Sequence, residues 1–561
     1  MVLFSTWRRR WLGSALVLML LTLAWPARAA ERIFLYFSIL ERSIDISSLE
    51  AFAEDGTVNR QLSGYFSLAG VDEAEHAELR RVLQEPAPIE PDLLSRILYT
   101  NIGEEILHNF GKLLRTEAGV NGEYALRAAL LLAVAEDDLS LLNFLRHLPL
   151  DMRVNLQSVL ELTQSVGDVA DATRFAIEKL EDLSDEEAGK DVAVDYAGLP
   201  QLDQRGDYGV RSLRWSLTSE RQNLQSGEPY PREFYVNVVH PAQWRPGKTP
   251  VIVLSHGLAS RPEYFAGLAA HMASYGYVVA MPQHPGSDVN YQNDLIKGLT
   301  NTLFDLGEFI DRPQDISAVI DELERRNDSE FGGRLDLEHV GVGGHSFGGY
   351  TALAVAGATI DFKNLETECG DRFGYLNTSL LLQCQARELP RQAYTFRDER
   401  VQSVLVMNPV NSSIYGREGL SQVQIPALVL SGSHDPATPA VFEQFRTFPW
   451  LGSQERYLGL IEGHAHIDFS VIDPGITDTI NSINGLTLAE SEIIETYSQG
   501  FSLAFFGVHA AQDEDYRRYL QASYSDFLSR EQRSPLHLIS DATNPELESV
   551  IEDFLADGLL D

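Results

Sequence analysis

A serine flanked by glycines is the feature of this chain with the clearest chemical meaning. Residues 344–348 read Gly-His-Ser-Phe-Gly, a G-x-S-x-G element centred on Ser346. When such an element forms a tight turn between a strand and a helix, the serine backbone is strained and its hydroxyl is exposed. The positions two residues before and two residues after the serine then have room only for glycine. The apolar run 337–342 and the small-residue run 350–356 predict that strand and that helix. We therefore expect Ser346 to be a nucleophile; the alternative is a glycine-rich turn without chemistry.

A nucleophilic serine needs a base to take its proton and an acid to orient that base. In one common arrangement the acid and then the histidine follow the serine along the chain. Asp435 follows the apolar run 427–430 in a turn-rich loop and is the predicted acid, with an Asx turn before the next proline as the alternative. His464 and His466 follow the run 457–461. We favour His466 as the base because it lies further from the strand, on a loop that can swing over the serine.

The oxyanion formed by attack on an acyl group needs two fixed N–H donors. The first predicted donor is the amide of Phe347, directly after the nucleophile. The second is the amide of Leu258, in the Ser-His-Gly-Leu sequence that follows the apolar run 251–254. A tight turn without this role would also explain the His-Gly pair.

The elements that must position these residues are those of an α/β fold with a mainly parallel sheet. Continuous apolar runs predict strands covered on both faces, with helical stretches between them. The runs are 251–254, 277–281, 401–407 and 427–430, and the helical stretches are 265–274 and 313–326. Alternating segments at 210–217 and 234–239 predict half-buried strands, and apolar residues at helical spacing predict helices over 497–507 and 516–527. We assign residues 205–530 to this catalytic domain and 531–561 to an acidic C-terminal tail.

The N-terminal part of the chain has a different pattern. From about residue 44 to 183 apolar residues recur at helical spacing, as in Ile106, Phe110 and Leu113. We therefore predict an all-helical domain over residues 30–190. At 561 residues the chain is too long for one ordinary core. The composition shifts to Asp, Glu, Gly and Gln over 182–209, where we place the domain boundary.

Residues 1–29 resemble a secretory signal peptide. Three arginines at 8–10 precede an apolar stretch over 11–25, and Ala27-Arg28-Ala29 forms a small-x-small cleavage site. The stretch is short for a membrane span. We expect an exported protein, periplasmic or extracellular, without a stable membrane span after signal removal; an uncleaved N-terminal anchor is the alternative. The run 8–12 also resembles a twin-arginine signal and does not decide the export route.

The net charge of the chain limits the classes of partner that it can bind. The net charge is −37, and losing the four arginines of residues 1–29 would make it −41. Nucleic acid and anionic lipid would repel such a chain, so we expect neither as a partner.

Cys369 and Cys384 are the only two cysteines. In an exported protein they favour a disulfide within one excursion of the chain, with two free thiols as the alternative. No metal-ligating motif is present and no cofactor is expected.

Four motifs together resemble the serine esterase branch of the α/β hydrolases. They are residues 254–258, 344–349, 431–435 and 463–466. That branch includes platelet-activating-factor acetylhydrolases, bacterial polyester hydrolases and dienelactone-hydrolase-like proteins, and the resemblance spans roughly residues 205 to 510. It implies hydrolysis of carboxylic esters through an acyl-enzyme, without metal or organic cofactor.

This chain departs from parts of that branch. The acetylhydrolases tend to carry the acid after the preceding strand, where Asn408 stands here and cannot act as a carboxylate. The polyester-hydrolase arrangement, with the acid after the next strand, suits Asp435 better. Dienelactone hydrolases use a cysteine nucleophile, and this chain has a serine. The N-terminal half resembles the N-terminal domain of exported cyanobacterial α/β hydrolases of undefined role, which implies no substrate.

Three functions fit these patterns. The leading one is an exported serine esterase or lipase-like enzyme that acts on small or lipid-derived esters. A peptidase of the prolyl-oligopeptidase type shares the triad, but such chains resemble two-domain proteins with a β-propeller in front, where this one is helical. The third is a non-enzymatic binding protein with a hydrolase fold.

The segment 362–397 is long for a connection and would either cap the site or pack on the sheet edge. The oligomeric state is not indicated.

Overall fold

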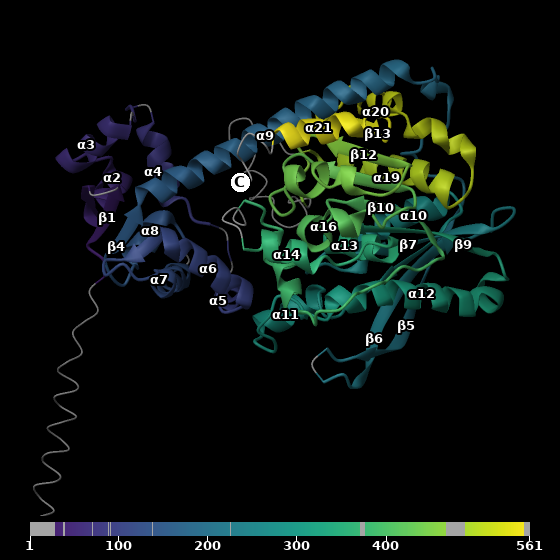
Figure 1. Ribbon diagram of the computed structural model, residues 1–561, viewed down its shortest axis with the longest axis horizontal. Coiled ribbons are helices and arrows are strands. Elements are labelled where there is room, and N and C mark those ends of the chain that lie inside the picture. Colours follow the sequence, from purple (N-terminus) through teal and green to yellow (C-terminus); the bar gives the residue numbers. More distant parts are fainter. Residues whose placement is uncertain are drawn as a thin grey trace, which may run out of the picture. The chain divides into compact units, whose positions relative to one another are not determined.

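The computed structural model describes residues 29–554 apart from 38–39, 70, 74, 88, 90, 137, 225, 371–375 and 467–488. The predicted signal peptide therefore lies outside the described residues, except for Ala29. The chain divides into two compact units, of which the first ends at Gln164 and the second begins at Ser165 (Figure 1). This division falls inside helix α9 (Leu156–Lys190) rather than at 182–209, because the helix runs without a break through the point where the contacts change.

The N-terminal unit is mainly helical, and it also contains a small sheet that the sequence did not predict. Its strands are β1 (Arg32–Phe37), β2 (Leu40–Asp45), β3 (Leu114–Thr116) and β4 (Met152–Asn155). They lie in the order β2-β1-β4-β3, with β1 parallel to β4 and the outer pairs antiparallel. Strands of three to six residues are too short to interrupt a helical pattern visibly, so periodicity did not reveal them.

The helices of this unit differ in how much they bury: two of them, 76–84 and 91–97, have no fully buried residue. The helices are α2 (Ile46–Asp55), α3 (Arg60–Ala69), α4 (His76–Gln84), α5 (Pro91–Ile97), α6 (Asn101–Leu113), α7 (Glu123–Ala135) and α8 (Leu141–Arg146). Leu107 of α6 and Leu126 of α7 meet Ile33 of β1 and Met152 of β4 in one core. Thr100 caps α6, its side chain accepting a hydrogen bond from the Gly103 amide.

The C-terminal unit is built on a nine-stranded sheet in the order β13-β12-β11-β10-β9-β7-β8-β6-β5. The strands are β5 (Val210–Gln222), β6 (Pro229–Pro241), β7 (Thr249–Ser255), β8 (Val278–Pro282), β9 (Leu335–His345), β10 (Val401–Met407), β11 (Ala427–Gly432), β12 (Arg456–Ile461) and β13 (Leu536–Ser540). The six strands from β8 to β12 in this order are parallel, and β5, β6 and β13 pair antiparallel at the two edges. This is the α/β-hydrolase fold that the sequence predicted.

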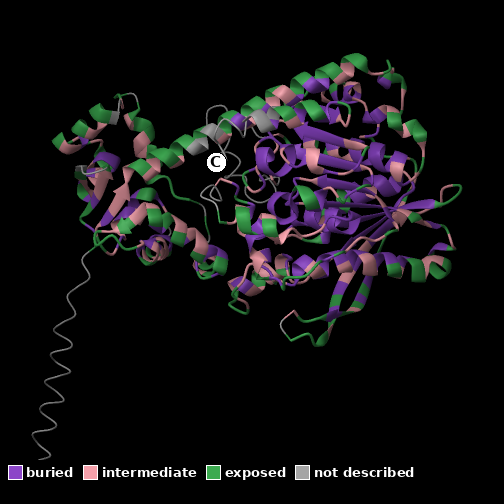
Figure 2. Ribbon diagram, viewed as in Figure 1, coloured by how far each residue is buried: buried purple, intermediate pink, exposed green. Residues whose placement is uncertain are grey.

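Further helices of this unit are α10 (Ala266–Ser274), α11 (Val289–Ile296), α12 (Glu308–Phe331), α13 (Phe347–Ala356), α14 (Phe362–Glu368), α15 (Leu380–Gln383), α16 (Ser412–Leu420), α19 (Ser491–His509), α20 (Ala522–Ser529) and α21 (Asn544–Phe554). Helices α10, α12, α13, α19 and α20 contact strands of the sheet. Helices α10 and α19 share a core with β7, β8 and β10, while α12 packs with α13. Every residue of β7 and β8 is buried, as expected of strands covered on both faces (Figure 2).

The register of the parallel strands brings their carboxyl ends to one edge. Ser255 at the end of β7 pairs with Gly344, and Met407 at the end of β10 pairs with His345. Gly432 at the end of β11 pairs with Ile461. Ligand sites of open α/β sheets lie outside such carboxyl ends, and the predicted site residues follow them directly.

The C-terminal segment, which we predicted as an acidic tail, contains a strand and a helix. Its residues 536–540 form β13, which pairs with β12, and residues 544–554 form α21; residues 555–561 lie outside the described part. The Ser184 hydroxyl of α9 accepts a hydrogen bond from the Leu538 amide at 3.1 Å. The acidic composition concealed a short apolar strand, Leu-His-Leu-Ile-Ser, that completes the sheet edge.

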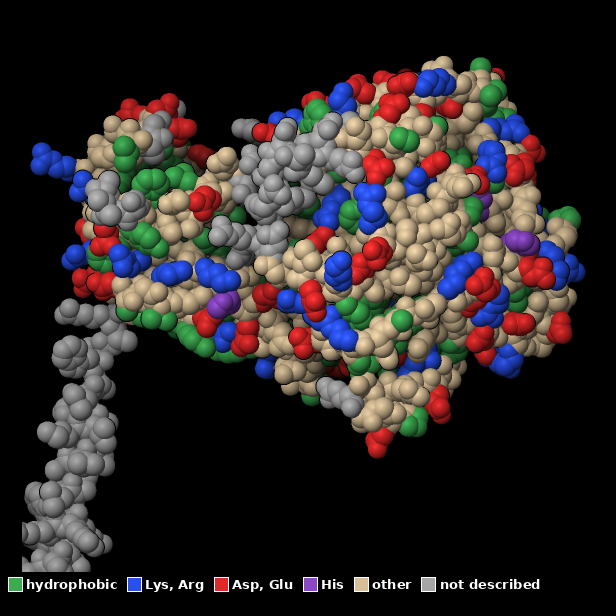
Figure 3. All heavy atoms as spheres, viewed as in Figure 1, with side chains coloured by type: hydrophobic (Ala, Val, Ile, Leu, Met, Phe, Trp, Pro, Cys, Tyr) green, Lys and Arg blue, Asp and Glu red, His purple; other side chains and the backbone are tan. Residues whose placement is uncertain are grey.

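The surface of the C-terminal unit carries mixed charge. Asp and Glu side chains are interspersed with Lys and Arg over the face shown in Figure 3. Among the residues that the structure describes, no helix combines the length and the hydropathy that crossing a membrane requires.

Candidate active site

Ser346 lies at the turn between β9 and α13 and has a strained backbone. Its φ of 57° and ψ of −119° are unusual for a residue with a side chain. A Cβ at Gly344 would lie 2.1 Å from the carbonyl oxygen of Gly348, and one at Gly348 would lie 1.9 Å from that of Ser255. Both flanking positions therefore require glycine, and the turn is the one that presents a nucleophile at the end of a strand.

The structure brings Ser346, His466 and Asp435 together from three loops. His466 Nε2 lies 2.8 Å from Ser346 Oγ, and His466 Nδ1 lies 2.7 Å from Asp435 Oδ2. His464, the alternative base, is not the ring at the serine: its carbonyl accepts a hydrogen bond from the His434 amide, beside the acid loop. The order and distances are those of a Ser-His-Asp triad.

The Asp435 carboxylate is buried and held on both oxygens. Oδ1 accepts hydrogen bonds from the amides of Ala437 and Thr438 at 2.8 and 2.9 Å, and Oδ2 accepts from the Thr438 hydroxyl at 2.7 Å. Burial alone would raise its pKa, but the charge and hydrogen bond of His466 and the bonds from Thr438 outweigh it, so the pKa is lowered. The group is therefore ionised and fixed toward the imidazole. The Asx turn that was the alternative interpretation is also present, and it serves to orient the acid.

Two residues that the sequence did not single out as functional hold the histidine loop. His345 Nε2 lies 2.7 Å from the carbonyl oxygen of His466, and the two rings are 4.6 Å apart. Burial, followed by the nearby His466, lowers the pKa of His345 to about 3, so its ring is neutral and donates to that carbonyl. Asn408 donates to the Ala465 carbonyl at 3.2 Å and accepts from the Gly432 amide at 2.9 Å, which joins the base loop to the acid strand. Its φ of 43° is one that asparagine tolerates.

The predicted oxyanion donors lie beside the nucleophile. Phe347 directly follows Ser346 as the first residue of α13. A Cβ at Gly257 would lie 3.3 Å from Ser346 Cβ, so the loop that carries Leu258 touches the serine. In the part of the chain that the structure describes, neither the Leu258 nor the Phe347 amide donates to another protein group. Two such amides beside a nucleophile are suited to bind an oxyanion.

A second hydrogen-bonded set of a serine, a histidine and an aspartate lies in the same unit. Ser255 Oγ lies 2.9 Å from His284 Nε2, and His284 Nδ1 lies 2.9 Å from Asp315 Oδ2. All three residues are 0% exposed, whereas Ser346 is 6% exposed. Burial lowers the pKa of His284 well below its usual range, with Arg312 as the next cause. By its distances alone, this second set could also be taken for a catalytic triad. Because all three residues are fully buried, no substrate reaches them, and we assign the set a structural role.

The insertion after α13 packs against the acid loop. Cys369 and Cys384 form a disulfide, with their Cα atoms 5.7 Å apart. The Thr378 hydroxyl donates to the carbonyls of Pro436 and Ala437, the residues directly after the acid. The segment therefore contacts the site through Thr378, and its residues 371–375 lie outside the described part.

The buried carboxylate of Glu443 anchors this insertion. It is 0% exposed and accepts hydrogen bonds from the insertion and from the segment that follows β10. The donors are the side chains of Asn377, Ser379, Gln383 and Ser412 and the amides of Asn411 and Ser412. With so many donors a buried carboxylate is stable without a cationic partner.

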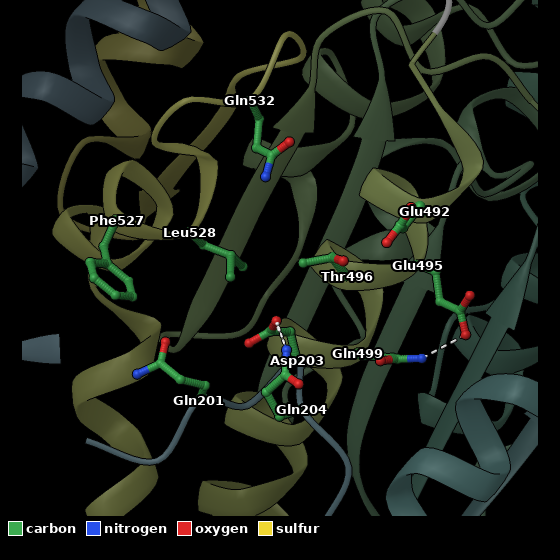
Figure 4. A pocket seen from close by; sticks show the side chains of 10 residues that line it. All are labelled: Gln201, Asp203, Gln204, Glu492, Glu495, Thr496, Gln499, Phe527, Leu528 and Gln532. Carbon is green, nitrogen blue, oxygen red and sulfur yellow. Dashed lines mark hydrogen bonds between the residues drawn. The ribbon is translucent and has the colours of Figure 1, made fainter. Parts of the chain in front are cut away.

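The pocket in Figure 4 is separate from the triad. Its volume is about 530 Å³, and it lies between the segment before β5, helix α19 and helix α20. The lining side chains are mostly amides and carboxylates, with Phe527 and Leu528 on one wall: Gln201, Asp203, Gln204, Glu492, Glu495, Thr496, Gln499, Phe527, Leu528 and Gln532. None of them belongs to the triad. Among the described residues, no group of three or more His, Cys, Asp or Glu is arranged to hold a metal ion.

Two family models match the chain. Residues 29–155 match the family described as alpha/beta hydrolase of unknown function (DUF1400), and residues 204–368 match the chlorophyllase family. No curated protein matches. The second match includes Ser346, Phe347 and Leu258 and ends before Asp435 and His466. Together with the sheet topology, the two matches assign an α/β-hydrolase domain to this chain and indicate a hydrolase.

Proposed function

We propose that this protein is a serine hydrolase that cleaves carboxylic esters through an acyl-enzyme. Ser346 is the nucleophile, His466 the base and Asp435 the acid. The observation that carries the proposal is the 2.8 Å contact between His466 Nε2 and a serine hydroxyl on a strained strand-to-helix turn. The other nitrogen of the ring faces a buried, ionised carboxylate, which fixes the ring in the tautomer that can accept the serine proton.

The reaction follows from this geometry in two halves. Ser346 Oγ attacks the ester carbonyl carbon while its proton passes to His466 Nε2, and the amides of Leu258 and Phe347 bind the oxyanion. The tetrahedral intermediate expels the alcohol oxygen, which takes the proton from His466 and leaves an acyl-serine. Water then gives a proton to His466 Nε2 and attacks the acyl carbon. The second tetrahedral intermediate breaks its bond to Ser346 Oγ, which takes that proton back from His466, and the carboxylic acid is released.

The substrates that we propose are small or lipid-derived esters. The chlorophyllase match covers the nucleophile and both oxyanion residues, so chlorophyll belongs among the esters to be tested. The placement of the acid after β11 favours the polyester-hydrolase arrangement over that of the acetylhydrolases.

A chain-length series of p-nitrophenyl acyl esters, with chlorophyll and an aminoacyl p-nitroanilide alongside, tests the proposal. We expect ester turnover that Ser346→Ala abolishes, and little or no cleavage of the anilide. The matched control is Ser403→Ala, which removes a buried hydroxyl from β10 outside the site. An active Ser346→Ala protein, or preferential cleavage of the anilide, would contradict the proposal.

We further propose that the protein is exported, on the evidence of the arginines at 8–10, the apolar stretch 11–25 and the Ala-Arg-Ala sequence at 27–29. N-terminal sequencing of protein recovered from the periplasm or the medium tests this. A mature chain that begins at Ala30 supports signal removal, and a chain that keeps residues 1–29 supports the anchor.

A further inference from the structure

The loop that carries the Leu258 amide is held from behind by a buried arginine. Arg312 of α12 donates through Nη1 to the His256 carbonyl at 2.7 Å and through Nη2 to the Gly257 carbonyl at 3.2 Å. Its side chain is 0% exposed. The planar guanidinium therefore binds two consecutive carbonyls of one loop, which is a geometry specific to arginine.

These hydrogen bonds determine where the Leu258 N–H points. The peptide between Gly257 and Leu258 is trans, and in a trans peptide the carbonyl and the N–H point in opposite directions. Because the Gly257 carbonyl faces Arg312, the Leu258 N–H is turned away from Arg312. His256 Nδ1 lies 2.8 Å from the same carbonyl, so the His256 ring and the Arg312 guanidinium together hold this peptide in place.

The same guanidinium contacts the residue of the second predicted donor. The Arg312 guanidinium carbon lies 4.4 Å from the centre of the Phe347 ring, within the range of a cation–π contact. The Phe309 ring packs against the Phe347 ring at 5.3 Å, which keeps the stack in place. One buried side chain thus binds the peptide that carries the Leu258 amide and contacts the ring of Phe347.

Arg312 is itself fixed by polar partners. Its Nε donates to the Ser287 hydroxyl at 2.8 Å and lies 3.4 Å from Glu308 Oε2, and Ser287 donates in turn to Glu308. The Ser287 carbonyl accepts a hydrogen bond from the Ala259 amide at 2.8 Å, so the same segment also holds the end of the loop. Burial lowers the pKa of Arg312 to about 10, which leaves it charged at neutral pH.

We propose that Arg312 is a positioning residue for ester hydrolysis, which orients the Leu258 and Phe347 amides toward the oxyanion. This inference rests on the proposed function. It requires the planar fork and not only a positive charge, since an ammonium group cannot bind both carbonyls and stack on the ring at once.

Arg312→Lys tests the inference against Arg232→Lys. Arg232 belongs to the same buried ionic cluster, with Asp315 at 2.8 Å and Glu308 at 2.8 Å, but it is not bonded to the loop. For Arg312→Lys we expect kcat to fall about 100-fold with KM within about threefold, as for loss of an oxyanion donor. The inhibition constant of a trifluoromethyl ketone, which binds as a tetrahedral adduct, should rise in parallel with the loss of kcat. For Arg232→Lys we expect a lower melting temperature with kcat within about threefold.

Ser287→Ala keeps the test decisive if Arg312→Lys does not fold. It removes the hydroxyl that receives Arg312 Nε without changing the buried charge, and we expect a fall in kcat of at least fivefold at constant KM. The inference is overturned if folded Arg312→Lys or Ser287→Ala retains kcat and inhibitor affinity, or if Arg232→Lys loses kcat equally. A wild-type protein without ester turnover or fluorophosphonate labelling would instead refute the proposed function, and this inference with it.

Discussion

Replacing Asp435 by asparagine tests the tautomer of His466, the proposed base, and the structure predicts which way the new amide points. Oδ1 of Asp435 accepts two backbone N–H groups, from Ala437 and Thr438. An asparagine must place its oxygen there, because the opposite orientation would set its NH₂ group against two donors. Its NH₂ group then faces His466 Nδ1.

An NH₂ group at that place can only donate. His466 must then accept at Nδ1 and carry its own proton on Nε2, the nitrogen that lies 2.8 Å from Ser346 Oγ. A protonated Nε2 cannot take the serine proton. The equivalent change in a serine protease lowers kcat about 10⁴-fold, which at about 1.4 kcal/mol per decade corresponds to about 5.5 kcal/mol of barrier.

The assay is kcat and KM for a p-nitrophenyl ester at saturating substrate, with Ser346→Ala as the floor. We expect Asp435→Asn to lose about 10⁴ in kcat with little change in KM, and its melting temperature to stay near the wild-type value. A folded Asp435→Asn protein within tenfold of wild-type kcat would refute this interpretation of the acid.

Three further predictions concern pH, the disulfide and Asn408. Burial lowers the pKa of His256, His284, His345 and His509, while burial raises that of Asp311 to about 6, so near pH 5 more of these groups gain a proton on unfolding than lose one. The free energy of unfolding should therefore be highest above pH 6.5 and fall as the pH is lowered toward 5. Denaturant titrations from pH 7.5 to 4.5 measure this slope, and a flat profile would contradict it. Replacing both cysteines by serine should cost about 3 kcal/mol of stability for a fifteen-residue loop and leave kcat within about threefold; equal stability with and without the bridge would contradict that. Asn408→Asp should not restore activity to Asp435→Ala, because its side chain is directed to Ala465 and Gly432 rather than to His466; recovery of kcat in the double variant would show otherwise.

The convergence of Ser346, Asp435 and His466 was predictable because each of them follows an apolar run that forms a strand. Parallel strands end at one edge of a sheet, so residues at the ends of β9, β11 and β12 had to converge. The choice of His466 over His464 was also made from the sequence, on the distance from the strand alone.

The supports of the site could not be predicted, because they depend on contacts between elements far apart in the chain. In the sequence, Arg312 is a charged residue beside Pro313 with no pattern that marks it as functional. The predicted helix 313–326 began at the proline. Helix α12 instead begins at Glu308 and includes the proline. Pro313 cannot donate to the Phe309 carbonyl, which accepts a hydrogen bond from the Tyr350 hydroxyl at 2.7 Å instead.

The role of Asn408 and the short strands were also not predicted from the sequence. In the sequence, Asn408 was noted only because no carboxylate stands at this position. Nothing local indicated that its side-chain amide joins the loop of His466 to the end of β11. The strands of the N-terminal unit and β13 are three to six residues long, and such lengths give too few alternations for a pattern.

The most direct test of a nucleophilic Ser346 is peptide mass spectrometry after reaction with an alkyl fluorophosphonate. We expect one phosphonyl adduct, on the peptide that contains Ser346, and none on the peptide with the buried Ser255. An unmodified Ser346, or equal labelling of the Ser346→Ala protein, would contradict the central claim.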